Sequence, residues 1–501
     1  MMKYLRRFFY FLIGLFVLIA LLLVWATQFA PARFRVNIPI QSILGGIDAN
    51  EQQVKQRLSA PAGFSISLYA SGVTNARVLR FSNTGDLLVS TPRTGQIILL
   101  KKDANGDGRA DESRVLIEGL NRPHGIDFYK DWLYIAESNG FGRIRFDHQN
   151  GKTIGDYQRL VTDIPDAGNH WTRTLRIGPN QKIYVSVGSS CNVCKEPDTR
   201  RATMLRYELD GSGFEIFASG LRNSVGFDWS PIDGKLYATD NARDLLGDDF
   251  PPDELNQVER GKFYGWPYAH GNRVADPEFG PKNAEIIANS TTPAHHFRAH
   301  NAPLGMGFLT DKRLPSQYQN IALVALHGSW NRTTKDGYKV VALSWSNHGQ
   351  ITEQPFVTGF EQDGHVVGRP ADVLQGPDSA IYISDDFAHA VYRVSWGEQP
   401  RSTGLTQTKT HAKTITPELS LNNEDTLADY RAGQNLYQQH RCARCHESAE
   451  QPTAIALKQL SARYDLASME QMLQTPTPPM PTFSLSSDQR RQLTTFLLLE
   501  Y

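Results

Sequence analysis

The stretch GDLLVST, residues 85–91, recurs in related form through the middle of the chain and decides the fold. Each copy is a short run of β-branched, aromatic and leucine residues, usually after a turn residue, which is typical of a β-strand. The other copies are DWLYIAE (131–137), QKIYVSV (181–187), GKLYATD (234–240), NIALVAL (320–326) and SAIYISD (379–385). A repeated strand unit at a period of about 50 residues predicts a propeller with one blade per copy. We therefore expect a mainly β fold, a six-bladed β-propeller over residues 60–397, with an irregular β-sandwich as the alternative.

Two features outside the regular spacing refine this prediction. The interval between the fourth and fifth copies is longer than the others, so the sequence predicts a sizeable insertion there. The run GFSISLYASG, residues 63–72, precedes the first copy and is also strand-like, so we expect it to supply the strand that closes the ring.

The repeat stops after Trp396, and the character of the chain changes. Residues 398–426 are polar, rich in Thr and Ser and without apolar periodicity, which is typical of a linker. From there the pattern becomes helical, and the run SSDQRRQLTTFLLLEY predicts a terminal helix with Ser486 or Ser487 as its N-cap. The sequence thus predicts a small all-α domain over residues 427–501.

The run HRCARCHE within this domain predicts a haem. Cys442, Cys445 and His446 form the Cys-x-x-Cys-His signature of c-type haem attachment, in which two thiols bond the porphyrin and the histidine binds the iron. A zinc or disulfide pair is the alternative. Residues 427–501 resemble the class I cytochromes c, in which a loop methionine also ligates the iron. The resemblance implies that Met480, in the Pro-rich loop before the last helix, is the sixth ligand.

The N-terminal segment predicts export of the chain. Lys3, Arg6 and Arg7 precede an unbroken apolar run over residues 8–26, which is long enough to span a bilayer. Early positive charges stay in the cytoplasm and direct the following domains outward. We favour an uncleaved anchor within residues 1–30 over a cleaved signal peptide. The expected location is the bacterial inner membrane, with the propeller and the haem domain in the periplasm.

Composition excludes two classes of protein. Lys plus Arg and Asp plus Glu both number 52, so the net charge is zero, whereas a nucleic-acid partner would favour a basic face. The four cysteines form two Cys-x-x-Cys pairs, which does not resemble a disulfide-dense small scaffold. Cys191 and Cys194 are followed by Lys195 rather than histidine, so they are not a second haem site. In an exported chain we expect a local disulfide, with a redox-active pair as the alternative.

Six stretches in the propeller region carry a resemblance to a known family. Together they resemble the glucose/sorbosone dehydrogenase family, six-bladed propellers that use pyrroloquinoline quinone (PQQ), and in particular its membrane-bound, sorbosone-dehydrogenase-like branch. The match covers residues 61–396. The stretches are GNHWTRTLRIGPN (168–180), SGLRNSVGFDWSP (219–231), TDNARDLLGDDFPPDELNQVERGKFYGWPY (239–268), HNAPLGMGF (300–308), ALHGSWNRTTKDGYKVV (325–341) and GRPADVLQGPDSAIYISDD (368–386).

The resemblance implies three catalytic residues. His170 falls on the family's general base, which takes a proton from a sugar hydroxyl as hydride passes to the quinone. A histidine suits this task because its pKa lies near neutral pH, and His124 is the rival base. Without the resemblance, a histidine bonded to a blade loop is the plainer interpretation. Arg222 and Asn223 fall on the pair that holds the quinone carbonyls and stabilises developing negative charge.

The resemblance also implies cationic partners for the three carboxylates of the quinone. Arg369 matches a family arginine in this role, whereas Ala371 stands where the soluble enzymes have a second arginine. His327 stands where those enzymes have a cofactor-binding lysine, and Arg332 or Lys339 is a candidate to supply the missing charge. These departures fit the sorbosone-like branch better than the soluble glucose enzymes.

Calcium is the second cofactor that the resemblance implies, because calcium prefers hard oxygen ligands. Backbone carbonyls near Ala242 and Arg243 are expected to hold the ion that polarises the quinone, and Asp253, Glu254 and Tyr264 to form a structural site. A solvated acidic loop is the alternative.

Another run, DANGDGRADE, has the oxygen-ligand spacing of an EF-hand loop at Asp103, Asn105, Asp107 and Asp111, with Arg114 in place of the bidentate Glu. A weak calcium loop and a plain turn are equally compatible with this pattern. A histidine cluster at His295, His296 and His300 is expected to be loop structure rather than a metal site.

These features together predict a quinoprotein that oxidises an aldose, alcohol or sugar aldehyde. The quinone would pass its electrons singly to the tethered haem, which would deliver them to another cytochrome or a respiratory oxidase. Two other functions remain open at this point: a calcium-dependent propeller lactonase in which His170 activates water, and a non-catalytic binding propeller with a haem relay.

Overall fold

The computed structural model describes residues 10, 14–15, 17–18, 37–43, 45–346, 348–397, 424–440, 442–446, 457, 460, 466–474, 483 and 485–500. They belong to two compact units, Met1–Ser402 and Thr403–Tyr501. The predicted anchor lies almost wholly outside the described residues. None of the helices within the described ranges is long and apolar enough to cross a membrane. The predicted linker, residues 398–426, also lies mostly outside them.

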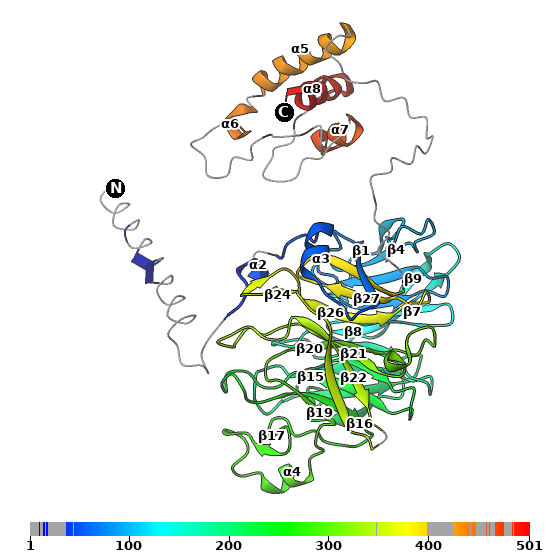
Figure 1. Ribbon diagram of the computed structural model, residues 1–501, viewed down its shortest axis with the longest axis vertical. Coiled ribbons are helices and arrows are strands. Elements are labelled where there is room, and N and C mark those ends of the chain that lie inside the picture. The colour runs from blue at the N-terminus through cyan, green and yellow to red at the C-terminus, as the bar shows by residue number, and fades with distance from the viewer. Residues whose placement is uncertain are drawn as a thin grey trace. The chain divides into compact units, whose positions relative to one another are not determined.

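The first unit is a ring of four-stranded antiparallel sheets, six in number, which confirms the predicted six-bladed propeller (Figure 1). The first strands of neighbouring blades contact one another around the centre of the ring. Blade 1 consists of β2 (Leu79–Phe81), β3 (Leu87–Thr91), β4 (Gln96–Leu100) and β5 (Ser113–Ile117). Blade 2 consists of β6 (Ile126–Tyr129), β7 (Trp132–Glu137), β8 (Gly140–Asp147) and β9 (Lys152–Val161). Blade 3 consists of β10 (Leu175–Ile177), β11 (Ile183–Val187), β12 (Thr203–Tyr207) and β13 (Glu215–Ser219).

The remaining blades follow the same order, except that the last takes its outer strand from the N-terminal side. Blade 4 consists of β14 (Ser224–Trp229), β15 (Leu236–Asp240), β16 (Asp253–Val258) and β19 (His295–Phe297). Blade 5 consists of β20 (Pro303–Phe308), β21 (Ala322–Leu326), β22 (Lys339–Trp345) and β23 (Ile351–Val357). Blade 6 consists of β26 (Pro370–Gln375), β27 (Ile381–Asp385), β28 (Ala390–Trp396) and β1 (Phe64–Ala70). Short elements outside the blades are α2 (Ile40–Ile43), α3 (Glu51–Arg57), a 3₁₀ turn at Ser316–Tyr318, β24 (Glu361–Gln362) and β25 (His365–Val366).

The repeated phrase found in the sequence is the second strand of every blade. These strands are β3, β7, β11, β15, β21 and β27, and nearly all of their residues are buried. A strand with sheet on both sides and blades on both faces has no solvent-facing positions, so it shows a continuous apolar run rather than alternation. This is why the phrase is the strongest repeat signal in the chain.

The strand β1 closes the ring, as the sequence predicts. It pairs with β28 from Phe64↔Trp396 to Ala70↔Val391, so the first strand of the unit completes the last blade. Gly63 makes the approach possible, because a Cβ at this position would lie 2.3 Å from the Trp396 ring, and its φ of +91° suits glycine. The closure joins the two ends of the propeller by main-chain hydrogen bonds.

The predicted insertion lies in blade 4, between β16 and β19. It contains β17 (Ala269–His270), β18 (Val274–Ala275) and α4 (Ala284–Asn289), which project beyond the blade in Figure 1. The buried Asp276 accepts charged hydrogen bonds from Arg243 Nη1 at 2.6 Å and lies 2.9 Å from His270 Nε2. These contacts tie the insertion to the loop between β15 and β16.

Three aspartates join neighbouring blades by hydrogen bonds around the central channel. Asp127, Asp228 and Asp372 lie on the first strands of blades 2, 4 and 6, and each accepts a backbone N–H from the first strand of the next blade. Arg176 bridges two of them, with Nε 3.3 Å from Asp127 and Nη2 3.2 Å from Asp228. Because a buried carboxylate needs hydrogen-bonded partners, these contacts fix the geometry between blades.

The second unit contains α5 (Glu424–Gln439), α6 (Ala443–His446), α7 (Leu466–Gln474) and α8 (Ser487–Glu500). Their apolar side chains form one cluster that includes the fully buried Met469. Ser486 is the N-cap of α8, because its Oγ accepts the Gln489 N–H while Gln489 Oε1 accepts the Ser486 N–H, a capping box. The helices confirm an all-α unit. Met480 and the side chain of Cys445 lie outside the described residues.

Candidate active site

The predicted site residues of the propeller gather at one end of the ring. Antiparallel strands alternate in direction, so the loops that join second to third strands lie at the same end as those that join one blade to the next. His170, Arg222 and Arg369 lie on inter-blade connections, and His327 and Ala242 lie on loops between second and third strands. The fold therefore brings together residues that are far apart in the sequence.

His170 is held through one ring nitrogen, and the other has no hydrogen-bond partner among the described residues. Its Nδ1 lies 2.8 Å from the Ser189 carbonyl oxygen and 2.9 Å from Ser189 Oγ. A carbonyl can only accept a hydrogen bond, so Nδ1 carries the proton and Nε2 presents a lone pair. Burial, with a contribution from the Arg222 charge, lowers the pKa of His170 to about 3. The imidazole is therefore neutral at pH 7 and able to accept a proton at Nε2.

Asn223 lies beside His170 with an unused oxygen. A Cβ on Gly188 would lie 2.6 Å from both Asn223 Oδ1 and His170 Cβ, so only glycine allows the two side chains to share this place. Asn223 Oδ1 is buried and has no hydrogen-bond partner within the described part of the chain. An orphaned buried acceptor is costly, so Asn223 Oδ1 is available to a ligand that reaches it.

Arg222 is held firmly, with one donor to spare. Its guanidinium donates to the Asn192 carbonyl (2.9 Å), Asn192 Oδ1 (2.8 Å), the Asn241 carbonyl (3.0 Å) and Asp244 Oδ2 (2.9 Å). A guanidinium has five N–H groups, so one N–H, on Nη1, has no partner among the described residues. Arg222 is 3% exposed, so a ligand that reached this N–H would meet a fixed, desolvated charge.

The backbone of the Arg222–Asn223 pair is fixed by a carboxylate at the end of β15. Asp240 accepts the N–H groups of both residues, at 2.9 and 2.6 Å. The same device recurs in two other blades, where Glu137 accepts the Asn121 N–H and Asp385 accepts the Arg369 N–H. Burial raises the pKa of Asp240 well above its usual range. An acidic residue at the end of the second strand thus positions the connection that enters each of these blades.

The loop between β15 and β16 presents free carbonyl oxygens. The carbonyls of Ala242 and Arg243 accept no hydrogen bond from any residue that the structure describes. The Ala242 N–H is bound by Asp253 Oδ1 at 2.8 Å, and the Arg243 guanidinium is bound by Asp276 and Glu278. Carbonyl oxygens without partners in a fixed loop fit a calcium ion.

The second predicted calcium site does not form from the three side chains that the resemblance implies. Asp253 and Glu254 are adjacent on β16 and therefore point to opposite faces. Asp253 binds the Ala242 and Ala302 N–H groups, whereas Glu254 binds the Gly271 N–H and the Asn256 amide. The Tyr264 hydroxyl donates to the Gln257 carbonyl. The structure thus does not bring these three side chains to one point, because strand alternation separates them.

His327 and Arg369 belong to one charged network. His327 Nε2 lies 2.8 Å from Asp386 Oδ1, and Arg77 Nη1 lies 2.7 Å from Asp386 Oδ2. Arg369 donates to the carbonyls of His327 and Gly328. Burial, together with the Arg369 charge, lowers the pKa of His327 to about 4. The imidazole of His327 is therefore neutral at pH 7, and the two arginines with one carboxylate leave a local excess of positive charge.

The two residues proposed to replace the family's lysine differ in their surroundings. Arg332 is buried and donates to the carbonyls of Asp248 and Ala299, so it fixes the loop between β15 and β16. Its Nε has no hydrogen-bond partner in the described ranges. Lys339 opens β22 at the same end of the ring and is partly buried.

The rival base, His124, lies deeper. It is 2% exposed and lines the central channel, and its Nδ1 lies 3.2 Å from Thr174 Oγ1. His170 is partly exposed and lies among the loops. His170 is therefore the more exposed of the two histidines, and its role as the base stays a prediction.

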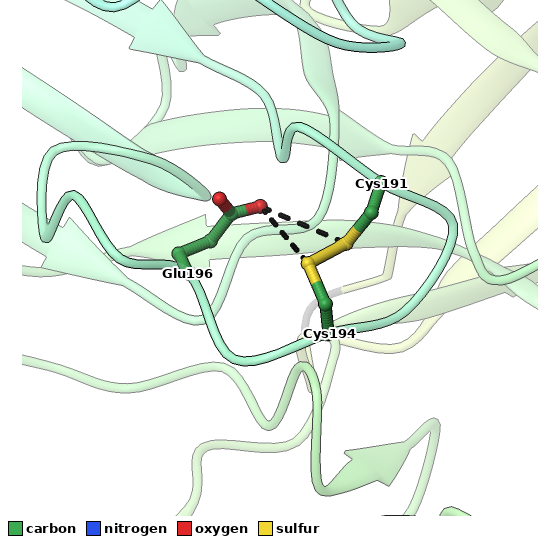
Figure 2. A group of neighbouring side chains, drawn as sticks. All are labelled: Cys191, Cys194 and Glu196. Atoms are coloured by element: carbon green, nitrogen blue, oxygen red, sulfur yellow. Dashed lines mark hydrogen bonds between the residues drawn. A yellow bond between two sulfur atoms is a disulfide. The ribbon is translucent and has the colours of Figure 1, made fainter.

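The remaining candidates have local roles. Asp103 Oδ1 and Oδ2 are occupied by the Gly106 and Gly108 N–H groups, and Arg114 donates to Gly151. His295 lies 3.0 Å from Glu353, and His300 Nε2 lies 2.8 Å from the Gly247 carbonyl, so these two histidines do not converge. Cys191 and Cys194 form the predicted local disulfide (Figure 2).

The fold and this site define a class of protein: a six-bladed propeller with a neutral histidine, an arginine–asparagine pair and a carbonyl-rich loop at one end. The chain belongs to the TrAA12-like family, whose model matches residues 58–366, more than half of the chain.

Three similar proteins bear on this identification. An uncharacterised protein of Borreliella burgdorferi is 29% identical over 385 residues, covering 73% of this chain and 98% of that protein. The pyrroloquinoline quinone-dependent pyranose dehydrogenase of Coprinopsis cinerea is 26% identical over 341 residues, 58% of this chain and 45% of that protein, so the match spans less than half of its length. A calcium structure of a Trichoderma reesei enzyme of carbohydrate-active family AA12 superposes with a TM-score of 0.59 at 22% identity, covering 68% and 97% of the two chains, which shows the shared fold.

Several functional residues were not found from the sequence. Ser189 orients His170, Asn192 and Asp244 hold Arg222, and Asp386 pairs with His327. Three copies of the repeated strand end in an acidic residue, namely Glu137, Asp240 and Asp385. This recurrence is visible in the sequence and could have indicated that these carboxylates accept backbone N–H groups of the connection that enters the blade. The others had no local signal, because each acts on a residue of another loop.

Proposed function

We propose that the propeller is a PQQ-dependent dehydrogenase that oxidises an aldose, alcohol or sugar aldehyde, as in the sorbosone-like branch of the wider family. One observation carries the proposal: the side chains of His170 and Asn223 lie next to each other at the loop end of the ring, and His170 Nε2, Asn223 Oδ1 and one N–H of the adjacent Arg222 have no partner among the described residues. The family membership and the pyranose dehydrogenase relative support it. When bound, the quinone accepts two electrons from the sugar.

The residues of the chain supply proton transfer and positioning. His170 Nε2 accepts the proton of the sugar hydroxyl, and Ser189 keeps the ring in the required tautomer. The Arg222 N–H on Nη1 and the amide N–H groups of Asn223 would donate to the quinone carbonyls and orient them. Arg369 and Arg77 would supply positive charge for its carboxylates, with the neutral His327 beside them as a further candidate contact. The carbonyls of Ala242 and Arg243 are the candidate calcium ligands, and calcium there would polarise the quinone.

We further propose that the second unit is a class I cytochrome c domain that takes the electrons singly. Cys442 lies one helical turn before His446, whose N–H bonds to the Cys442 carbonyl at 3.2 Å, and Cys442 packs on the apolar cluster of the unit. Cys442 and Cys445 would hold a haem through thioether bonds, and His446 would bind its iron. The downstream acceptor would be another cytochrome or a respiratory oxidase, with the N-terminal segment as the membrane anchor.

Haem reduction tests the whole scheme. The full chain with haem would be supplied with PQQ and calcium, offered a panel of aldoses and alcohols, and followed by its haem absorption. Reduction that requires both quinone and substrate is expected. If the protein does not bind quinone, the result would point instead to a lactonase or a binding propeller. If an added dye is reduced but the haem is not, the electron relay would be contradicted.

The acid limb of the activity should lie at unusually low pH. The His170 pKa is lowered from its usual 6.5 to about 3, so the neutral form needed for proton abstraction persists down to that pH and is lost only below it. We expect kcat/KM, which reports the free enzyme, to show no limb near pH 6.5. A single protonation near pH 6.5 that abolishes turnover would contradict this environment.

Met480→Ala should change the spectrum of the haem without removing it. A thioether ligand gives oxidised cytochromes c a weak near-infrared band from sulfur to iron, and it raises the reduction potential. Loss of the band and a lower potential are expected, whereas Met469→Leu, a core change, should preserve both. Survival of the band in Met480→Ala would assign the sixth ligand elsewhere.

A further inference from the structure

The loop between β11 and β12 carries residues that the proposed chemistry does not use. Residues 189–196, named here the disulfide loop, contain the Cys191–Cys194 bond. Glu196 accepts hydrogen bonds from Ser190 N (2.6 Å) and Ser190 Oγ (2.8 Å). The same carboxylate packs against both sulfurs, at 3.8 and 3.7 Å (Figure 2). A covalent bond and a carboxylate anchor thus fix this loop.

Asn192 lies inside the disulfide ring and uses both ends of its amide. Its Oδ1 accepts hydrogen bonds from Arg222 Nη2 and from the Asp244 N–H, each at 2.8 Å. Its Nδ2 donates to the Asp244 carbonyl at 3.1 Å, and its own carbonyl accepts Arg222 Nε at 2.9 Å. Asn192, in blade 3, therefore links Arg222, which lies just before blade 4, to Asp244 in the loop between β15 and β16.

The disulfide loop also reaches the candidate base. Ser189, at the start of the loop, donates its N–H to the Arg222 carbonyl at 2.8 Å and accepts from His170 Nδ1. Ser189 Oγ donates to the Cys191 carbonyl at 2.7 Å. His170, Arg222 and the segment 242–244 thus all rest on one short, cross-linked stretch of chain.

We infer that Asn192 is a positioning residue of the dehydrogenase site, and that the Cys191–Cys194 disulfide holds it in place. It sets Arg222 and the calcium-facing segment 242–244 in one arrangement before any ligand binds. The inference rests on the proposed function. The side chain at position 192 must accept two hydrogen bonds at Oδ1 and donate one from Nδ2 to a carbonyl, and only an amide can do both. A carboxylate here would lose the donor and repel Asp244.

The first test is Asn192→Ala in the full chain, with two readouts. Hydrogen exchange followed by mass spectrometry, without quinone or calcium, should show faster exchange in residues 241–250, because the Asp244 N–H loses its acceptor. Titration with PQQ in the presence of calcium should show binding about tenfold or more weaker, since hydrogen bonds to a charged group are lost.

Two further variants separate the parts of the inference. Asn192→Asp preserves the shape and keeps an acceptor for Arg222, so faster exchange at 241–250 is expected with less effect at residues 220–224. The double change Cys191→Ser and Cys194→Ser leaves Asn192 in the chain but frees its loop, so a smaller change in the same direction is expected. Asn180→Ala is the matched control, because this asparagine bonds to Tyr184 at the opposite end of the same blade.

The outcomes distinguish this inference from the proposed function. If the wild-type chain binds no PQQ, the proposed function fails, and the exchange data without ligand still decide the role of Asn192. Exchange at 241–250 that is unchanged in a folded Asn192→Ala chain overturns the positioning role. Unchanged exchange in the double serine variant overturns the role of the disulfide. Faster exchange throughout the propeller, also in Asn180→Ala, would mean general destabilisation and would overturn the inference as well.

Discussion

His170→Ala is expected to lower kcat/KM for sugar oxidation by about 10²–10⁴-fold, the usual contribution of a positioned general base. The side chain is held by Ser189, and its Nε2 has no hydrogen-bond partner among the described residues, so this nitrogen is placed to accept the proton. Quinone binding should persist, because Arg222 and Asn223 are unchanged. Steady-state kinetics with an artificial acceptor and a separate PQQ titration would measure the two effects independently.

Two histidines serve as comparisons for this variant. His365, on β25, is exposed, so His365→Ala should leave kcat/KM unchanged. His124→Ala removes the rival base from the channel and should act mainly through packing, with lower thermal stability and nearly normal pH dependence. If His124→Ala abolished turnover while His170→Ala retained it, the assignment of the base would be reversed.

Arg222→Lys is expected to weaken PQQ binding by about 10- to 100-fold, since hydrogen bonds to charged groups contribute about 1.5–3 kcal/mol. Lysine keeps the charge but cannot reproduce the planar fork. It cannot bind the Asn192 carbonyl, Asn192 Oδ1, the Asn241 carbonyl and Asp244 together. The affinity should be measured by titration of the protein with PQQ at saturating calcium.

The matched control for Arg222→Lys is Arg260→Lys. The Arg260 side chain is 70% exposed, and its one partner among the described residues is Glu215 at the surface, so quinone affinity should not change. Tight quinone binding by Arg222→Lys would show that the guanidinium geometry is not needed, and it would remove Arg222 from the cofactor site.

Much of the fold could be predicted because its signals are local. The second strand of each blade is buried on every side, so GDLLVST and its relatives stand out from the flanking sequence. Strand β1 and the insertion in blade 4 were visible as an extra copy and a longer interval. The N-cap Ser486 was predicted as one of two choices, because a capping box involves residues only three apart.

The candidate site could be predicted only in part. His170, Arg222 and Asn223 came from a resemblance rather than from any physical pattern, since a single histidine or arginine carries little information by itself. Asn192 was missed although its disulfide was expected, because its partners Arg222 and Asp244 belong to other loops. Closeness in sequence does not make Asp253, Glu254 and Tyr264 a shared calcium site. Successive side chains along β16 point to opposite faces of the sheet, so Asp253 and Glu254 are separated.

The sequence by itself determined the strands, the number of blades, the closing strand and the two units, because these depend on burial patterns that repeat along the chain. The tertiary structure alone decided which side chains meet. Strand direction alternates within every blade, so every second loop lies at the same end, and residues from blades 3 to 6 converge there. Their hydrogen bonds across blades, such as Asn192 to Arg222, then fix the tautomer, the charge and the free donors that define the site.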